Sequence, residues 1–208
     1  MNRRLRPSLS GLAIGMAALA ANAAWATSAS VAVVDADGKP LADAVVWAMV
    51  KGTRMQAAPG TNAQIAQRER QFQPQLSVVQ TGTSVWFPNF DTVRHHVYSF
   101  SPIQRFELRL YAGTPAAPVV FDKAGVAALG CNIHDRMQAW VVVVDTPFFT
   151  RTDTAGTATL DLPPGDHRLR IWHALMGDSL APVERSLTVG ATLGARLTVA
   201  LPRREAAP

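Results

Sequence analysis

The sequence predicts an all-β protein. Short runs rich in Val, Phe and Trp recur between clusters of Gly, Pro, Asp and Asn, which is typical of strands joined by turns. Regular helical periodicity is scarce outside the N-terminal segment. Hydrophobic residues make up 48% of the 208 residues, an ordinary fraction for a globular protein, so disorder, collagen and coiled coil are excluded.

The N-terminal segment predicts an export signal. Residues 3–6 carry three arginines, an apolar run follows over 11–20, and Ala24-Trp25-Ala26 offers a small-x-small cleavage site. We therefore expect a signal peptide over residues 1–26, cleaved after Ala26, and a periplasmic location. The apolar run is too short for a membrane span and no later stretch reaches that length, so no membrane anchor is expected.

Removal of this segment changes what the charge implies. It holds three cations and no acids, so the formal net charge of +5 falls to +2 over the remaining 182 residues. A nearly balanced chain gives no support for nucleic-acid binding. Cys131 is the single cysteine in the sequence, which excludes an internal disulfide. A lone thiol in an oxidising compartment is expected to be buried or bound to something.

The expected strands share a content of β-branched and aromatic residues. They span residues 31–34, 44–50, 76–79, 85–87, 96–100, 119–121, 139–144, 158–162 and 169–172.

Three details of this strand pattern refine the expectation. Residues 141–144 lack alternation, which predicts a central strand covered on both faces. Residues 124–129 remain ambiguous between helix and a short extended segment. Residues 28–50 predict a hairpin with its turn at 35–40, and residues 149–171 predict a further pair of strands.

The chemistry concentrates around the single cysteine. Cys131, His134 and Met137 fall at i, i+3 and i+6, in a segment that leaves one apolar run and enters the next. A tight loop at a strand end can turn all three side chains toward one point. Upstream, His95 and His96 supply two more imidazoles at the start of a strand.

One thiolate, two imidazoles and one thioether form the ligand set of a blue-copper site. Sulfur suits copper(I) and nitrogen suits copper(II), so a rigid site of this kind is a compromise that both oxidation states can occupy. Ligation also explains the lone cysteine, because binding protects the thiolate from oxidation. Each residue taken alone has a plainer explanation as core or surface, and only the conjunction favours a metal.

Residues 65–145 resemble a small periplasmic cupredoxin of the amicyanin, pseudoazurin and plastocyanin kind. Phe72-Gln73-Pro74 and the segment 82–87 resemble the family's opening strands, and Asn89-Phe90-Asp91 resembles the loop before its first ligand histidine. The Cys-x-x-His-x-x-Met loop has the length of amicyanin's. This resemblance implies a Greek-key β-sandwich that binds one type 1 copper ion. The segments 94–100 and 130–135, taken together, also resemble exported proteins labelled methylamine utilization proteins.

The resemblance also bears on the choice between the two upstream imidazoles. His95 matches the ligand position, and His96 stands where cupredoxins often carry Asn. Alternation along a strand places the two rings on opposite faces, so one of them reaches the metal. We assign His95, Cys131, His134 and Met137 as the metal ligands and keep His96 as the alternative to His95.

Two further stretches resemble one other module. Residues 31–50 and 152–171 resemble the opening hairpin and middle strands of the carboxypeptidase regulatory-like, or transthyretin-like, β-sandwich. We expect a cupredoxin domain at 62–145 inserted into a discontinuous sandwich of 27–61 and 146–205. The alternative is an extra N-terminal hairpin on the cupredoxin followed by a separate sandwich.

These features predict a periplasmic electron carrier that catalyses no bond chemistry. The expected partner is another redox protein, a cytochrome or a dehydrogenase, bound through a small transient interface. The alternative is a protein that binds copper(I) for storage or delivery. A sandwich that has lost its copper is disfavoured by the intact ligand set. Multicopper oxidases need His-x-His pairs, and dinuclear centres need a second Cys, and the sequence has neither.

Overall fold

A computed structural model describes residues 26–51, 54–134, 136–190 and 195–202. Within these residues the protein is all-β, as predicted, with one 3-10 turn at Ala174–Met176. The expected signal peptide lies almost wholly outside the described residues. No helix in the described part is long and apolar enough to cross a membrane.

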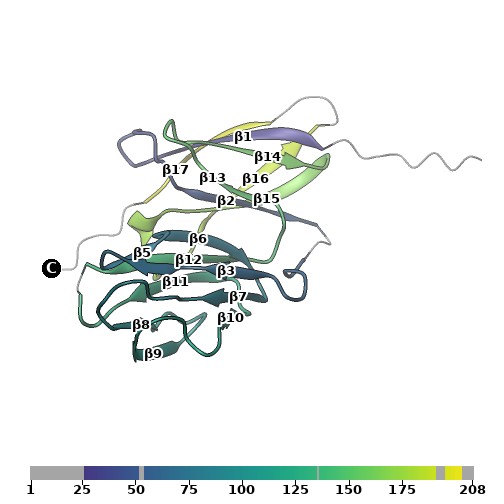
Figure 1. Cartoon of the computed structure of the whole chain (residues 1–208). Helices are drawn as coiled ribbons and strands as arrows, with labels where there is room; N and C mark the ends of the chain where they lie inside the picture. The colour runs from purple at the N-terminus through teal and green to yellow at the C-terminus, as the bar shows by residue number, and fades with distance from the viewer. Residues whose placement is uncertain (1–25, 52–53, 135, 191–194, 203–208) are drawn as a thin grey trace, which may run out of the picture.

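Two sheets form one half of the molecule (Figure 1). The first has the order β14-β1-β17 and the second has the order β13-β2-β15-β16. Their strands are β1 (Thr27–Val34), β2 (Val45–Val50), β13 (Phe149–Arg151), β14 (Thr157–Leu162), β15 (Gly165–Trp172), β16 (Val183–Val189) and β17 (Arg196–Ala200).

The other half contains a five-stranded sheet of order β6-β12-β11-β8-β9, a three-stranded sheet of order β10-β7-β3 and the small hairpin β4-β5. Their strands are β3 (Asn62–Gln64), β4 (Ala66–Arg68), β5 (Gln71–Gln73), β6 (Leu76–Gln80), β7 (Thr83–Trp86), β8 (His95–Ser99), β9 (Phe106–Tyr111), β10 (Val119–Phe121), β11 (Gly125–Gly130) and β12 (Gln138–Val144).

Strand β12 is covered on both faces. Its last four residues are all buried, although alternate side chains of a strand point to opposite sides of its sheet. Val141 and Val143 belong to the core shared with the sheet β10-β7-β3, whereas Val142 and Val144 belong to the core shared with β2 and β15. The absence of alternation in the sequence therefore predicted this strand correctly.

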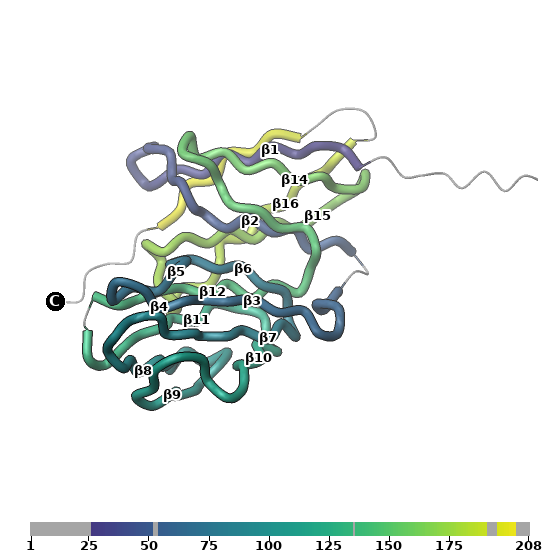
Figure 2. Tube along the Cα trace, in the orientation of Figure 1, coloured from purple at the N-terminus to yellow at the C-terminus, as the bar shows by residue number. Residues whose placement is uncertain are grey.

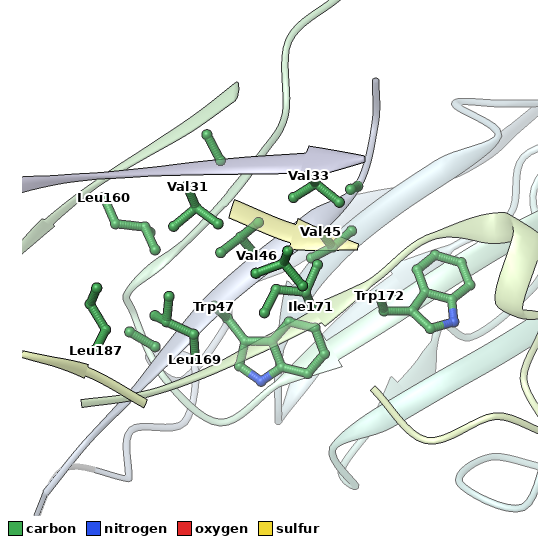
Figure 3. Packing of buried hydrophobic residues seen from close by; sticks show 14 of the residues in the cluster. Val31, Val33, Val45, Val46, Trp47, Leu160, Leu169, Ile171, Trp172 and Leu187 are labelled. Atoms are coloured by element: carbon green, nitrogen blue, oxygen red, sulfur yellow. The ribbon is translucent and has the colours of Figure 1, made fainter. Parts of the chain in front are cut away.

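The larger core joins three sheets. Val31 and Val33 of β1 belong to one cluster with Val46 of β2 and Ile171 of β15, which pair across the second sheet, as Figure 3 shows. Trp172 at the end of β15 packs edge-on against Trp140 of β12, with ring centroids 5.3 Å apart. Burial of this apolar surface is the main force that holds the two halves together.

The chain leaves the first half and later returns to it. β1 pairs antiparallel with β14 and parallel with β17, and β2 pairs with β13 and β15. In Figure 2 the purple N-terminal strands accordingly lie among green and yellow C-terminal strands, with the teal middle of the chain below them. Among the described residues β6 pairs with β12 and not with β1. This pairing supports an insertion, and the domain boundaries stay a prediction.

The expected hairpin over residues 28–50 is wrong. A turn does form at its predicted place, since Asp35 Oδ1 accepts hydrogen bonds from the backbone N–H groups of Asp37 at 3.0 Å and Lys39 at 2.9 Å. After Leu41, however, the chain crosses to the neighbouring sheet, so β1 and β2 do not pair. The strands over 149–171 separate in the same way, because β13 pairs with β2 while β14 pairs with β1. Each of the two sheets in this half thus contains strands from both the N-terminal and the C-terminal part of the chain.

Strand boundaries differ from the sequence pattern at several other places. The ambiguous segment 124–129 is strand β11, and β8 begins at His95, one residue earlier than expected. Strands β9, β16 and β17 are not anticipated by the pattern. They lie at sheet edges, where exposed charged residues such as Glu107 and Arg109 of β9 interrupt the apolar run.

His173 has a structural role in the 3-10 turn that follows β15. Its Nε2 lies 3.1 Å from the carbonyl oxygen of Ala42, and its Nδ1 accepts a hydrogen bond from the N–H of Leu175 at 3.2 Å. Burial lowers the pKa of His173, which favours the neutral ring that this pair of contacts requires. The plainer expectation for His173, a strand-end histidine, agrees with this geometry.

Trp172 provides a test of the joint between the halves. It is fully buried, and its Nε1–H donates to the carbonyl oxygen of Gly177 at 2.7 Å. Trp172→Ala is expected to lower the free energy of unfolding by about 3–5 kcal/mol, because it leaves a large cavity beside Trp140. Chemical denaturation measures the change, with Leu180→Ala, at a 36% exposed position, as the control that stays near wild type. A Trp172 variant as stable as that control would contradict this packing.

Candidate metal centre

Two neighbouring strands bring the upstream histidine to the cysteine. His95 is the first residue of β8, and Cys131 directly follows the last residue of β11. These strands are antiparallel neighbours, with Gly130 opposite Tyr98, so the start of one lies beside the end of the other. A Cβ atom on Gly130 would lie 2.6 Å from the ring of Tyr98. A larger residue at position 130 would therefore displace the end of the Tyr98 side chain, next to the cysteine.

A short loop brings the second histidine to the same place. β11 and β12 pair as far as Gly130 and Gln138, so the intervening segment closes the hairpin between them. The backbone N–H of Met137 donates to the carbonyl oxygen of His134 at 2.9 Å, which forms a tight turn. Cys131 and Met137 are therefore the first and last residues of the loop between β11 and β12, and His134 lies in its middle.

The potential ligand atoms of His95, Cys131 and His134 converge. One atom from each lies within 4.8 Å of the other two. Cys131 Sγ is 3.9 Å from His95 Nδ1, and the imidazole rings of His95 and His134 have centroids 5.1 Å apart with planes at 60°. Within the described part of the chain, no other group of three or more His, Cys, Asp or Glu side chains converges in this way.

The environment of this cluster suits a soft metal ion. His95 and Cys131 are buried, and His134 is partly buried. His134 Nδ1 is shielded from solvent and has no hydrogen-bond partner among the residues that the structure describes, a costly arrangement unless something else binds the nitrogen. Thiolate and imidazole are the donors that copper and zinc take in proteins. The residues present therefore fit a bound copper ion.

Met137 lies in the same core as the cysteine. Its side chain is 1% exposed, and it belongs with Cys131 and Phe121 to the cluster beneath the five-stranded sheet. A buried thioether in this core is consistent with the expected weak axial ligand. The assignment of Met137 as a ligand stays a prediction.

The two adjacent histidines face different surroundings. His96 is also buried, but its ring packs edge-on against Tyr98 with centroids 5.7 Å apart, and it does not join the cluster. Within the described part of the chain, His96 Nε2 has no hydrogen-bond partner. The geometry thus favours His95 over His96, although the pairing of β8 with β9 is irregular between His95 and Val97.

Asn89 shapes the loop that leads to His95. Its side-chain amide donates to the carbonyl oxygens of Val93 at 2.9 Å and Tyr111 at 3.0 Å, and its Oδ1 accepts from the N–H of Asp91 at 2.9 Å. Asn89 is 4% exposed, so its bonds within the loop are shielded from water. The amide closes the loop and ties it to the edge strand β9.

His95 has a second contact, which the sequence pattern does not predict. Its Nε2 lies 2.7 Å from Oδ2 of Asp91. Burial of the Asp91 carboxyl opposes ionisation, but hydrogen bonds from the Arg70 N–H and from His95 outweigh it, and the net effect lowers the pKa of Asp91. In the sequence, Asn89-Phe90-Asp91 indicates only the loop before His95. The carboxylate of Asp91 can contact His95 because the turn at Glu69 and Arg70 holds it in place, and this turn becomes its neighbour only in the folded chain.

Comparison with known proteins gives partial likenesses. No family model matches the chain, and no curated protein matches it. Among solved structures, a purple cupredoxin from Nitrosopumilus maritimus is 25% identical, with a TM-score of 0.36, and the match covers 39% of this chain and 98% of that one.

Two amicyanin structures give similar values. An oxidized mutant of amicyanin is 17% identical over 47% of this chain and 98% of its own, with a TM-score of 0.36. Amicyanin from Paracoccus versutus is 15% identical over 46% and 96%, with a TM-score of 0.35. The structural neighbours are cupredoxins. Each spans less than half of this chain, and the assignment of the site rests on the geometry of His95, Cys131 and His134.

The choice between His95 and His96 can be tested by metal binding. His95→Ala is expected to reduce copper(II) affinity by more than the roughly 10–100-fold typical for loss of an outer partner, because it removes a ligand. His96→Ala should bind copper with nearly wild-type affinity, since its ring lies outside the cluster. Competition with a chelator measures both constants, and the reverse order of affinities would show that His96 is the ligand.

Proposed function

We propose that this chain is a type 1 copper protein that carries single electrons between redox partners. The observation that supports this most strongly is the convergence of Cys131 Sγ with the ring nitrogens of His95 and His134. Bound copper would supply a one-electron couple between its +1 and +2 states. His95, Cys131, His134 and Met137 would hold it.

The fold supports such a role because the ligands are held by strands and a short loop. His95 belongs to β8, and Cys131 and Met137 are the first and last residues of the connection between β11 and β12. Little movement is then needed when the charge of the site changes, which favours fast electron transfer. The buried thiol is also protected from the oxidation that an exposed cysteine would undergo.

A partner would approach through the exposed residues near the loop ends. Ile133 is 45% exposed beside the partly buried His134, and Phe90 is 51% exposed on the loop before His95. The guanidinium carbon of Arg68 lies 3.9 Å from the centre of the Phe90 ring. We propose that a periplasmic cytochrome or dehydrogenase docks here briefly, and that the protein itself catalyses no bond chemistry. Export to the periplasm rests on the N-terminal sequence pattern.

The electron-carrier proposal predicts a coloured copper(II) protein. Purified protein loaded with copper(II) is expected to show an intense visible thiolate-to-copper band and a narrow hyperfine splitting in electron paramagnetic resonance. Cys131→Ser should abolish the band because no thiolate remains. Met137→Leu should keep the colour and raise the reduction potential, because loss of thioether donation disfavours copper(II). Met55→Leu, at an exposed position, is the matched control.

A colourless copper(II) adduct would contradict the electron-carrier proposal. Tight copper(I) that neither exchanges electrons with a cytochrome nor becomes oxidised, but passes to an acceptor, would instead indicate copper storage or delivery.

A further inference from the structure

The carboxylate of Asp91 is held in a fixed position at the back of His95. Oδ1 accepts a hydrogen bond from the N–H of Glu69 at 2.7 Å, and Oδ2 accepts one from the N–H of Arg70 at 3.0 Å. Glu69 and Arg70 form the turn between β4 and β5, with φ values of +53° and +58°. This left-handed turn directs two successive N–H groups toward one anion, an arrangement that binds carboxylates well.

The same carboxylate oxygen reaches the buried histidine. Oδ2 lies 2.7 Å from His95 Nε2, and the His95 side chain is fully buried while that of Asp91 is 15% exposed. Asn89 Oδ1 accepts a hydrogen bond from the backbone N–H of Asp91 at 2.9 Å. Asp91 is thus anchored by its own loop and by the β4-β5 turn before it contacts His95.

This contact determines which ring nitrogen of His95 carries the proton and which is left free to bind a metal. An ionised carboxylate only accepts hydrogen bonds, so Nε2 must carry the proton. In the neutral ring Nδ1 is then left without a proton, and Nδ1 is the nitrogen 3.9 Å from Cys131 Sγ. No described residue plays this part for His96, whose buried Nε2 is without a hydrogen-bond partner among them.

We propose that Asp91 is a positioning residue that fixes the tautomer and orientation of His95, so that Nδ1 is presented beside Cys131 and His95 rather than His96 completes the site. The proposal deepens the proposed copper function and rests on it only where copper is added. A carboxylate behind a ligand imidazole also raises its donor strength, and loss of such an outer partner typically reduces metal affinity by about 10–100-fold.

The first test uses the metal-free protein and is independent of copper. Nitrogen-15 NMR of the wild-type protein in mildly alkaline buffer is expected to show His95 as the neutral tautomer with its proton on Nε2. In Asp91→Ala the ring loses its acceptor, and the two tautomers should interconvert. A wild-type His95 with its proton on Nδ1 would overturn the proposal, even if no variant folds.

Two control variants separate this contact from general damage. Arg70→Gly removes a charged side chain but keeps the N–H that binds Asp91, and glycine tolerates the positive φ. Asp153→Ala removes another carboxylate that accepts two backbone N–H groups, in the distant turn before β14. Both controls should retain the wild-type tautomer of His95. Loss of the tautomer in either control would contradict a specific role for Asp91.

The second test adds copper(II) and measures affinity and reduction potential. Asp91→Ala is expected to lose about 10–100-fold in affinity and to shift the potential upward, because a negative charge and a stronger donor are lost. Asp153→Ala should change neither value. Unchanged copper properties in Asp91→Ala would overturn the tuning role. Failure of the wild-type protein to bind copper would refute the proposed function but leave the tautomer result standing.

Discussion

The register between β8 and β11 is the constraint on which the candidate site depends. Gly130 lies opposite Tyr98, leaves room for its ring and directly precedes Cys131. A shift of one residue would turn His95 to the opposite face and replace it with His96. The sheet that contains β8 and β11 also contains β12, whose valines pack alternately into two different cores. The packing of β12 thereby helps to hold in place the strands that carry His95 and Cys131.

The second pair of sheets contributes to this rigidity. The buried Trp172 of β15 packs against the partly buried Trp140 of β12 and joins the halves, and strands from both ends of the chain close the larger core. One face of the sheet that contains β8 and β11 is therefore covered by the protein itself. The surface left for a partner lies at the loop ends, near Phe90 and Ile133, which suits the brief contacts expected of electron transfer.

The sequence was sufficient to predict the all-β class, the central buried strand and the three converging side chains. The first two, and the pairing of Cys131 with His134, depend on local patterns such as the uninterrupted valines of 141–144, whereas His95 was assigned from the family resemblance and strand alternation. It failed for the hairpin over 28–50, because a good turn at Asp35 is compatible with either pairing or crossing to another sheet. Edge strand β9 was missed because Glu107 and Arg109 face solvent. Asp91 was not assigned because its anchor, the turn at Glu69 and Arg70, becomes a neighbour only in the folded chain.

The central claim is that one thiolate and two imidazoles bind the same metal ion. X-ray absorption at the copper edge, measured on the loaded wild-type protein, tests it most directly. We expect one short copper–sulfur distance and two imidazole nitrogens bound directly to copper. A first shell of nitrogen and oxygen alone would contradict it, as would a wild-type spectrum that persists after Cys131→Ser.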